Sequence, residues 1–244
     1  MSADTLRPWL KMQDLTFLRG DRTILKSVSL DIQPGELTLL TGQNGSGKTT
    51  LLRILAGLQK PQQVQFEFAG EQQKWRQSYR FLRDQICYLH QQPYLFDGSV
   101  SENIAYGLKR QRMGRQAIKA KVAEALEQIS LEHLAQRNSR ELSGGEKQRV
   151  AIARAWALAP RLMLLDEPVS NLDKRSRHIC YDLINQLQQQ KIGVIYTSHE
   201  PQAGHLKINR HLHLYEGEMT TKPLTNEKAA VVELVKGNPN QSRG

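Results

Sequence analysis

The sequence has few cysteines, no long apolar segment and no apolar leader, and each shortage narrows what the protein can be. Its 244 residues include only two cysteines, Cys87 and Cys180, which are isolated and form no metal-binding pattern. We therefore expect two reduced thiols. No run of 18 or more apolar residues is present, so we expect no helix that crosses a membrane. Residues 1–8 contain no apolar signal region, which predicts a cytosolic chain.

Acidic residues are also scarce. The chain holds 34 Lys and Arg against 24 Asp and Glu, a net charge of +10. Part of this excess lies in residues 74–121, where ten basic residues are opposed only by Asp84, Asp97 and Glu102. Three interpretations are open: a face near anionic lipid headgroups, a phosphate-binding face for nucleic acid, or a solvated helical face. Because aromatic residues are sparse in this segment, the pattern does not favour single-stranded nucleic acid, and we expect no nucleic-acid partner.

The chain is long enough for one α/β domain with a sizeable core, and it shows no internal repeat. Residues 11–32 alternate apolar and polar side chains, which predicts strands of an antiparallel edge sheet. Pro34-Gly35 marks a turn. Residues 36–58 carry a strand, a loop and a helix, whereas the polar residues 70–80 indicate a loop that leads into a helical region.

Helical spacing recurs further along the chain. Residues 101–108 predict a capped helical turn that ends near Gly107, and residues 117–129 and 181–190 predict amphipathic helices. Residues 226–237 predict one short helix, followed by a polar tail.

A Gly-rich loop near the N-terminus matches the phosphate-binding pattern G-x-x-x-x-G-K-[ST]. Its residues are Gly42, Gln43, Asn44, Gly45, Ser46, Gly47, Lys48 and Thr49. A strand-like run, 37–41, precedes the loop, and a helix-like run begins at Thr50, a further expected nucleotide contact. Glycines let the backbone fold around phosphates. We expect Lys48 to reach the β- and γ-phosphates and the Thr49 hydroxyl to bind Mg²⁺.

A second Gly-rich element, Leu142–Arg149, indicates which class of nucleotide-binding protein this is. Ser143, Gly144 and Gly145 expose backbone N–H groups at the start of a predicted helix, 146–158. A helix N-terminus carries unsatisfied donors and partial positive charge, and it therefore suits an anion. Two such helix starts in one chain predict a nucleotide gripped from two sides.

Polar residues follow two short apolar runs that suit buried strands. Asp166 and Glu167 follow residues 162–165, at the strand end where open α/β sheets place ligand chemistry. We expect Asp166 to hold Mg²⁺ and Glu167 to polarise the attacking water. His199 follows the other run, 192–198, and is expected to face the γ-phosphate. The alternatives are two acids that end a strand in solvent and a structural histidine.

Together these residues resemble the ATPase subunit of an ATP-binding cassette (ABC) system, over roughly residues 10–217. The matching elements are Walker A (Gly42–Thr49), the Q-loop Gln91, the signature (Leu142–Gln148), Walker B (Leu162–Asp166) with the catalytic Glu167, the D-loop (Ser170–Asp173) and the switch His199. All six motifs stand in the family's order, which makes the match far more specific than any single motif.

The resemblance implies an α/β fold: a P-loop NTPase core with an antiparallel β edge subdomain and an inserted helical subdomain. The expected domain is 10–220, its helical subdomain spans about 85–155, and 221–244 is a tail. The resemblance also implies ATP and Mg²⁺ as cofactors, with Gln91 as a further metal ligand. A head-to-tail dimer with a second copy or a paralogous cassette would place ATP on Lys48 of one subunit and on Ser143–Gly145 of the other.

The adenine contact departs from the family pattern. An aromatic residue usually stacks on adenine shortly before the position of Gly20, where this chain has Arg19, with Phe17 two residues earlier. A guanidinium can stack on a ring, so Arg19 is the expected adenine contact. Phe17 is equally well explained as a core residue.

The resemblance further implies a transporter whose permease subunits are separate chains, with the ATPase peripheral on the cytoplasmic face of the plasma membrane. A coupling helix of the permease is expected in a groove lined by Tyr94, Leu95, Phe96 and Val100, which could equally be core residues. Residues 102–108, with Gly107 among them, resemble the same segment of importer cassettes for small anions. This resemblance favours a tungstate-type oxyanion as the transported substrate and a solute-binding protein in the complex.

Two other functional classes remain open. Cassettes for lipoprotein release or division-site signalling are similar in length and motifs. Soluble ABC ATPases that act on ribosomes or DNA carry two cassettes or long coiled coils, which this chain lacks. We expect no regulatory domain after the cassette, so sugar importers with that domain are poorer matches.

Overall fold

A six-stranded sheet forms the centre of the computed structural model, which describes residues 8–68, 70–198 and 206–222. The strand order is β10-β9-β3-β8-β7-β6, and every neighbouring pair is parallel except β10 with β9. The strands are β3 (Leu37–Thr41), β6 (Ile86–Leu89), β7 (Leu162–Leu165), β8 (Gly193–Thr197), β9 (Arg210–Tyr215) and β10 (Glu218–Lys222). Strands β6, β7, β8 and β9 all run parallel to β3. The carboxyl ends of these five strands therefore share one edge of the sheet, where α/β sheets place ligands.

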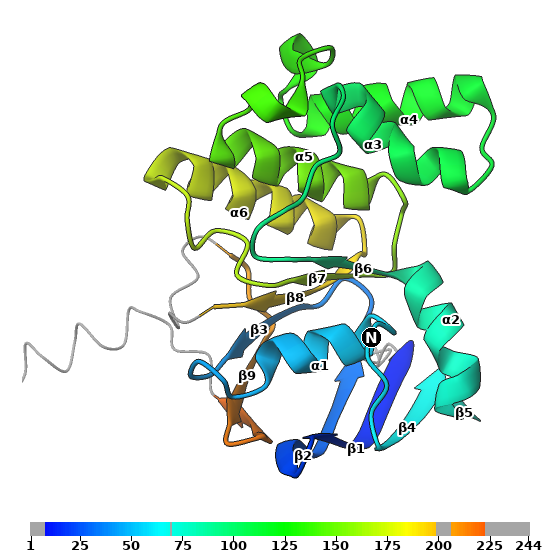
Figure 1. The fold of residues 1–244 in the computed structure, drawn as a ribbon, viewed down its shortest axis with the longest axis vertical. Helices are drawn as coiled ribbons and strands as arrows, with labels where there is room; N and C mark the ends of the chain where they lie inside the picture. Colours follow the sequence, from blue (N-terminus) through cyan, green and yellow to red (C-terminus); the bar gives the residue numbers. More distant parts are fainter. Residues whose placement is uncertain (1–7, 69, 199–205, 223–244) are drawn as a thin grey trace, which may run out of the picture.

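A separate antiparallel sheet lies below the first in Figure 1, in the order β2-β1-β4-β5. Its strands are β1 (Leu10–Arg19), β2 (Arg22–Ile32), β4 (Gln63–Phe68) and β5 (Glu71–Gln73). The alternation in residues 11–32 therefore predicted β1 and β2 correctly, and Gly35 has a φ of 70° in the turn that follows. The expected α/β fold with an antiparallel sheet is confirmed.

The helices cover both faces of the six-stranded sheet (Figure 1). They are α1 (Lys48–Leu55), α2 (Trp75–Gln85), α3 (Val100–Arg110), α4 (Arg115–Gln128), α5 (Gly144–Trp156) and α6 (Lys174–Gln189). Helix α1 lies between the two sheets, α5 and α6 cover the opposite face, and α3 and α4 form an outer layer. Within the described residues, none of these helices combines the length and the apolar character that a bilayer crossing needs.

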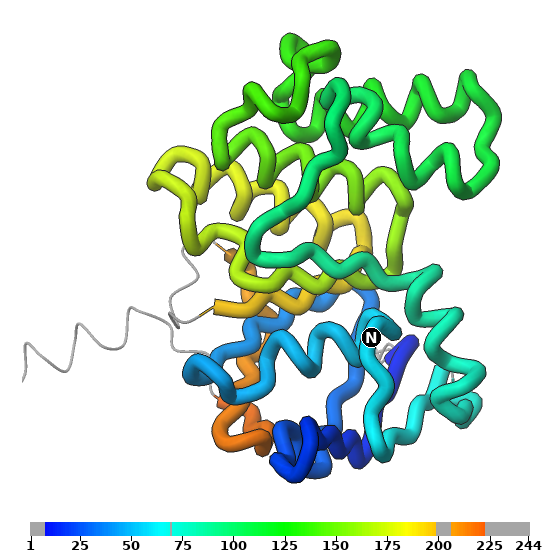
Figure 2. Tube along the Cα trace, viewed as in Figure 1, coloured from blue at the N-terminus to red at the C-terminus, as the bar shows by residue number. Residues whose placement is uncertain are grey.

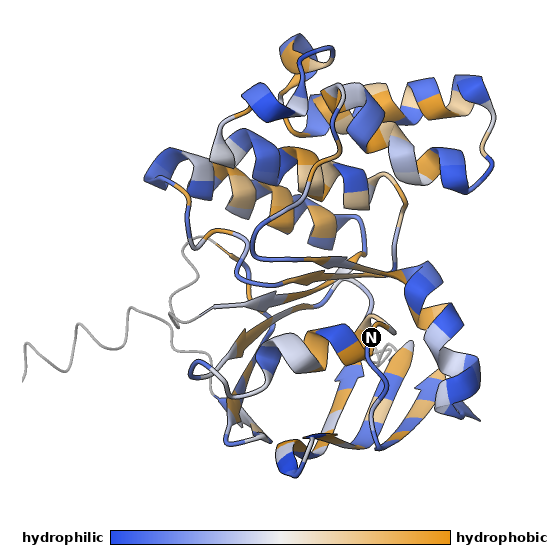
Figure 3. Ribbon diagram, viewed as in Figure 1, coloured by the Kyte–Doolittle hydropathy of each residue, from blue (hydrophilic) through white to orange (hydrophobic). Residues whose placement is uncertain are grey.

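The apolar side chains gather between these layers, as the orange inner faces in Figure 3 show. Leu40, Leu162 and Leu164 point toward α1, whereas Leu39 and Leu165 point toward α5 and α6. Each fully buried leucine contributes about 1.5–3 kcal/mol relative to an exposed one. Both faces of β3 and β7 are therefore held by core packing, which fixes the strand ends that carry the polar residues.

A third apolar cluster joins α3, α4 and α5, and the chain reaches it through residues 90–99, which run from β6 to α3 (Figure 2). Helix α3 continues through Gly107, so the expected end near that residue was wrong. A Cβ at Gly107 would lie 2.6 Å from a methyl of Leu158. Gly107 thus permits close packing of α3 on the end of α5, instead of ending the helix.

The expected loop at residues 70–80 was also wrong, because this segment forms β5 and then α2. Ser78 and Leu82 are buried on one face of α2, and Trp75 and Phe81 pack against the antiparallel sheet. This spacing is helical, but it is masked by the many basic and polar residues between. The exposed side of α2 carries part of the basic excess.

Two helices begin earlier than the apolar pattern indicated. Helix α5 begins at Gly144, not 146, because Ser143 and Glu146 form a capping box around its first turn. Helix α6 begins at Lys174, not 181, because Asp173 caps it by accepting a hydrogen bond from the Ser176 N–H. The predicted helix at 226–237 lies outside the described residues.

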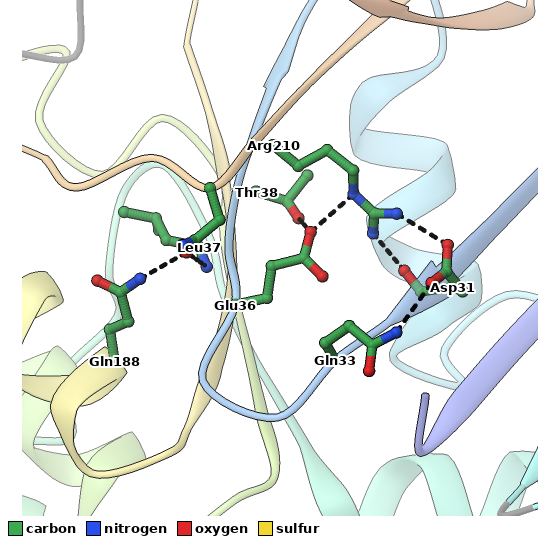
Figure 4. Close-up of polar contacts among 8 residues, drawn as sticks. Asp31, Gln33, Glu36, Leu37, Thr38, Gln188 and Arg210 are labelled. Carbon is green, nitrogen blue, oxygen red and sulfur yellow. Dashed lines mark hydrogen bonds and ion pairs between the residues drawn. The ribbon is translucent and has the colours of Figure 1, made fainter. Parts of the chain in front are cut away.

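An ion-pair network ties the start of β9 to the two sheets, as Figure 4 shows. The Arg210 guanidinium pairs with Asp31 at 2.8 Å and with Glu36 at 2.7 Å, and it also donates to the Asp31 carbonyl. Thr38 and Gln33 donate to the same two carboxylates. The network therefore links β2, β3 and β9 at the sheet edge opposite to the phosphate loop.

The pairing of Asp31 predicts a small loss of stability in acid. Burial raises the pKa of Asp31, but the hydrogen bond and charge of Arg210 outweigh it and hold the pKa below the usual 3.8. The stabilisation is fully present above the unfolded-state pKa and is lost as pH falls through the lower folded-state pKa. We expect Asp31→Asn to cost up to about 1 kcal/mol at pH 6, since the pair is partly exposed, and less at pH 3. Urea unfolding of both proteins at both pH values measures this; an unchanged difference would contradict it.

Candidate functional site

The Gly-rich loop, Gly42–Thr49, connects β3 to α1 at the carboxyl edge of the six-stranded sheet. Gly45 and Gly47 have φ values of 78° and 109°, a region that favours glycine. A Cβ at Gly42 would lie 2.3 Å from the Leu214 carbonyl oxygen on β9. The loop conformation thus depends on glycine at these positions, and it directs the following helix N-terminus toward the sheet edge, where a phosphate can bind.

Lys48 is buried within this loop, with only 6% of its surface exposed. Its Nζ donates to the Gly42 carbonyl at 2.7 Å and to the Gln43 carbonyl at 3.1 Å. Burial lowers the pKa of Lys48, while the negative charges of Glu167 and Asp166 act in the opposite direction. The ammonium is therefore already placed inside the curve of the loop, where phosphate oxygens can replace the two carbonyls.

The loop also contains a polar atom that suits a ligand. The Ser46 hydroxyl is buried and lacks a hydrogen-bond partner within the described part of the chain. A buried hydroxyl without a partner is unfavourable, and a bound phosphate would satisfy it. The residues present therefore fit a nucleotide phosphate.

Thr49 and Asp166 meet at the first turn of α1. The Thr49 hydroxyl donates to Asp166 Oδ2 at 2.9 Å, and Asp166 follows β7 with only 4% of its surface exposed. A hydroxyl and a carboxylate are oxygen ligands of the kind that Mg²⁺ prefers. The two residues predicted to bind the metal are thus brought together, and their chemistry fits it.

Glu167 has a left-handed backbone, with a φ of 48°. Its N–H donates to the Thr197 hydroxyl at 2.9 Å, and its carboxylate accepts a hydrogen bond from the Gln91 amide at 3.2 Å. A strained non-glycine residue held by such contacts is typical of functional sites. The conformation turns Glu167 away from the line of β7 and toward Gln91.

Gln91 was predicted as both a catalytic residue and a metal ligand. Its amide nitrogen contacts Glu167 and also the Ser170 hydroxyl, at 3.3 Å. Ser170 in turn donates to the Glu167 carbonyl at 3.1 Å. Among the described residues, Gln91 therefore joins the Glu167 side of the site and not the Thr49–Asp166 pair.

The second predicted phosphate-binding helix start lies away from the first. Ser143 caps α5, and Gly144 and Gly145 form its first turn. Helix α5 packs on the face of the six-stranded sheet opposite to α1. A Cβ at Gly145 would lie 2.3 Å from the Ser176 hydroxyl on α6, whereas one at Gly144 would have no neighbour within 4 Å. The two helices whose starts were predicted to bind phosphate thus lie on different sides of the sheet within one chain.

The remaining predicted residues fall into three groups. Arg19 ends β1 and is exposed, while Phe17 is buried in the core beneath it. Val100 is buried in the α3–α5 cluster and cannot line a surface groove, whereas Tyr94 is 71% exposed. His199 lies outside the described residues.

Two residues at this site were not foreseen from the sequence: Tyr88 on β6 and Thr197 at the end of β8. Both hydroxyls donate to Asp166, at 2.9 and 3.0 Å. Burial and the charge of Asp166 raise the pKa of Tyr88, so it stays a hydrogen-bond donor. The only sequence feature that could have pointed to Tyr88 and Thr197 is that each is a polar residue inside a strand-like run.

Comparison with known proteins identifies the family of this chain. The family described as ABC transporter matches residues 25–170. The chain is 39% identical over 198 residues to the Fe(3+) ions import ATP-binding protein FbpC of Escherichia coli K12, which covers 80% of this chain and 56% of that protein. It is 41% identical over 188 residues to the sulfate/thiosulfate import ATP-binding protein CysA of the same organism, covering 74% and 50%. The chain thus spans about half the length of the curated relatives it matches.

Two solved structures of ABC proteins are also similar to this chain. The cbiO1 protein from Clostridium perfringens, described as part of the ABC transporter complex cbiONQ, superposes with a TM-score of 0.83 at 28% identity, over 94% of this chain and 93% of that one. The ATP-binding cassette MJ0796, solved as a dimer in a post-hydrolysis state with ADP and Pi, gives a TM-score of 0.76 at 28% identity, over 89% and 99%.

Proposed function

This chain belongs to the ABC transporter family, and from that premise we propose that it binds ATP with Mg²⁺ and hydrolyses the ATP to drive a separate membrane permease. The observation that carries the proposal is the convergence of Lys48, Thr49, Asp166 and Glu167 at one sheet edge, two of them joined by a 2.9 Å hydrogen bond. Phosphoryl transfer needs positioning and charge stabilisation, and these four side chains supply both.

Each side chain has a distinct role in the proposed reaction. Lys48 leaves the Gly42 and Gln43 carbonyls and binds the β- and γ-phosphates, and the exposed N–H groups of the loop bind the remaining oxygens. Thr49 and Asp166 would hold Mg²⁺, which supplies positive charge to the phosphate oxygens when it is bound. Glu167 accepts a proton from the attacking water, with Gln91 and His199 as further contacts in the site.

A complete site requires a second cassette in this proposal. The helix start at Ser143–Gly145 lies on the other side of the sheet from Lys48, and a head-to-tail dimer would place it on the partner's ATP. The dimeric form of MJ0796 supports such an arrangement for a protein of the same fold. The partner is a second copy of this chain or a paralogous cassette, and Arg19 is our candidate for the adenine contact.

The permease would bind beside the Gln91 segment. Tyr94 is 71% exposed, and the rings of Phe96 and Tyr106 lie 4.2 Å apart next to it. The Arg154 guanidinium covers Phe96 and donates to the Tyr94 carbonyl at 2.8 Å. An exposed group of aromatic residues held by an arginine suits a protein interface. This location would keep the protein peripheral on the cytoplasmic face of the plasma membrane.

The proposed cargo is a small oxyanion, delivered with the help of a solute-binding protein. The similarity to a sulfate/thiosulfate import protein supports an oxyanion, and the Fe(3+) import protein supports the broader class of small-solute importers. We retain 10–220 as the ATPase domain, about 85–155 as its helical subdomain and 221–244 as a tail in this proposal.

Co-purification tests the proposed permease directly. We expect tagged Glu167→Gln protein, extracted from membranes with mild detergent, to bring with it a multi-spanning membrane subunit that mass spectrometry identifies. Lys48→Ala is the matched control, since it should not stabilise the ATP-bound complex. Recovery of an oxyanion permease supports the import proposal. Recovery of a lipoprotein-release or division complex assigns the chain to that functional class instead. Recovery of ribosomal proteins or nucleic acid alone overturns the transporter proposal.

A further inference from the structure

Three hydroxyl groups from three different elements surround the Asp166 carboxylate. Tyr88 on β6 donates to Oδ2 at 2.9 Å, Thr49 on α1 donates to the same oxygen at 2.9 Å, and Thr197 on β8 donates to Oδ1 at 3.0 Å. Strands β6, β7 and β8 are neighbours in the sheet, so the Tyr88 and Thr197 donors come from either side of the strand that carries Asp166. Both carboxylate oxygens are thus held by neutral donors.

These contacts matter because Asp166 is only 4% exposed. A buried carboxylate needs hydrogen bonds to replace its lost hydration, and these hydroxyls donate to both of its oxygens. Thr197 is fully buried, and the same hydroxyl accepts the Glu167 N–H at 2.9 Å. One side chain therefore fixes the carboxylate of Asp166 and the left-handed backbone of Glu167 together.

The three hydroxyls differ in what happens when a metal binds. Thr49 is itself an expected Mg²⁺ ligand, so a bound metal would replace its hydrogen bond to Asp166. Tyr88 and Thr197 reach Asp166 from β6 and β8 and are free to keep their hydrogen bonds. Groups that orient a metal-binding carboxylate in this way raise metal affinity, because the ligand pays less to become ordered.

We propose that Tyr88 and Thr197 are positioning residues that hold Asp166 in its metal-binding orientation, and that they set the affinity of the nucleotide site for Mg²⁺. This inference rests on the proposed function, because it concerns the same site. Neither residue contacts the nucleotide in the proposal; each acts through Asp166, and Thr197 acts through Glu167 as well.

The test separates metal affinity from nucleotide affinity. Binding of a fluorescent ATP analogue is measured in EDTA and then across a Mg²⁺ titration, for wild type, Tyr88→Phe, Thr197→Val and Thr197→Ser. We expect Tyr88→Phe and Thr197→Val each to raise by about tenfold the Mg²⁺ concentration at which half of the Mg²⁺-dependent change in analogue binding is reached. Binding of the ATP analogue in EDTA should be unchanged. Thr197→Ser keeps the hydroxyl and should behave as wild type. Tyr79→Phe and Thr221→Val are controls that remove a tyrosine or threonine hydroxyl far from Asp166.

The variants and the wild-type protein test the inference and the proposed function separately. Wild-type Mg²⁺ dependence in a folded Tyr88→Phe or Thr197→Val protein overturns the inference, and so does a Thr197→Ser protein as impaired as Thr197→Val. If Thr197→Val does not fold, which a melting curve shows, Tyr88→Phe decides the matter alone. If the wild-type protein binds no ATP analogue with or without Mg²⁺, the proposed function fails, which is a different outcome from a failure of this inference.

Discussion

Replacing Glu167 with glutamine is expected to reduce ATP hydrolysis by at least about 100-fold while ATP binding is retained, because the amide cannot accept a proton from the attacking water. The change is nearly isosteric, and the Glu167 N–H keeps its hydrogen bond to Thr197. The left-handed backbone at this residue is therefore preserved. Phosphate release under saturating ATP measures the loss, and equilibrium binding of ATP measures what is retained.

The matched control is Glu124→Gln, which makes the same chemical change on the exposed face of α4. It should hydrolyse ATP at the wild-type rate. A Glu167→Gln protein that turns over ATP as fast as Glu124→Gln would remove Glu167 from the catalytic role. A protein that neither binds nor hydrolyses would instead indicate that the carboxylate supports the phosphate loop, through the charge that it places near Lys48.

Mixing two inactive variants is expected to restore hydrolysis, because the two phosphate-binding helix starts belong to different subunits of the proposed dimer. Lys48→Ala removes the phosphate-binding ammonium. Gly144→Asp places a negative charge at the start of α5, where a Cβ meets no neighbour within 4 Å, so the fold should tolerate it. A carboxylate there also suits the helix dipole but repels the partner's γ-phosphate. In a mixed dimer, one of the two sites contains neither change.

The expected recovery is roughly a quarter of wild-type activity, since half of randomly paired dimers are mixed and each has one intact site of two. The control mixes Lys48→Ala with a chain that carries both changes, which gives no dimer with an intact site and should recover nothing. No recovery in the first mixture, with both variants folded, would show that each chain completes its own site or that the two sites must act together.

The parts of the site that are continuous in sequence were predictable. The strand before the Gly-rich loop lies where the pattern placed it, and the helix after the loop begins at Lys48, slightly before the expected Thr50, because glycine spacing and a short apolar run are local signals. Asp166 and Thr49 are 117 positions apart, yet both were assigned to the metal, Thr49 from the Gly-rich loop pattern and Asp166 from its place at the end of a strand-like run.

What could not be predicted depends on the strand order. Tyr88 and Thr197 contact Asp166 only because β6 and β8 flank β7, and no local pattern states which strands become neighbours. Helix α2 was missed for a different reason: its buried face is narrow, and Ser78 occupies a position where an apolar residue would have made the periodicity visible. The capped starts of α5 and α6 show that polar capping residues locate a helix end better than the first apolar residue does.

The pairing of β3 with strands from later in the chain affects the order in which parts of the protein fold during synthesis. This strand leads directly into the phosphate loop, but its two neighbours are β8 and β9, which begin at Gly193 and Arg210. A ribosome therefore releases the loop long before the strands that hold it, and β3 stays an unpaired apolar strand until β8 and β9 have been translated. The phosphate loop should be among the last parts of this protein to become rigid, although its residues are translated well before those of β8 and β9.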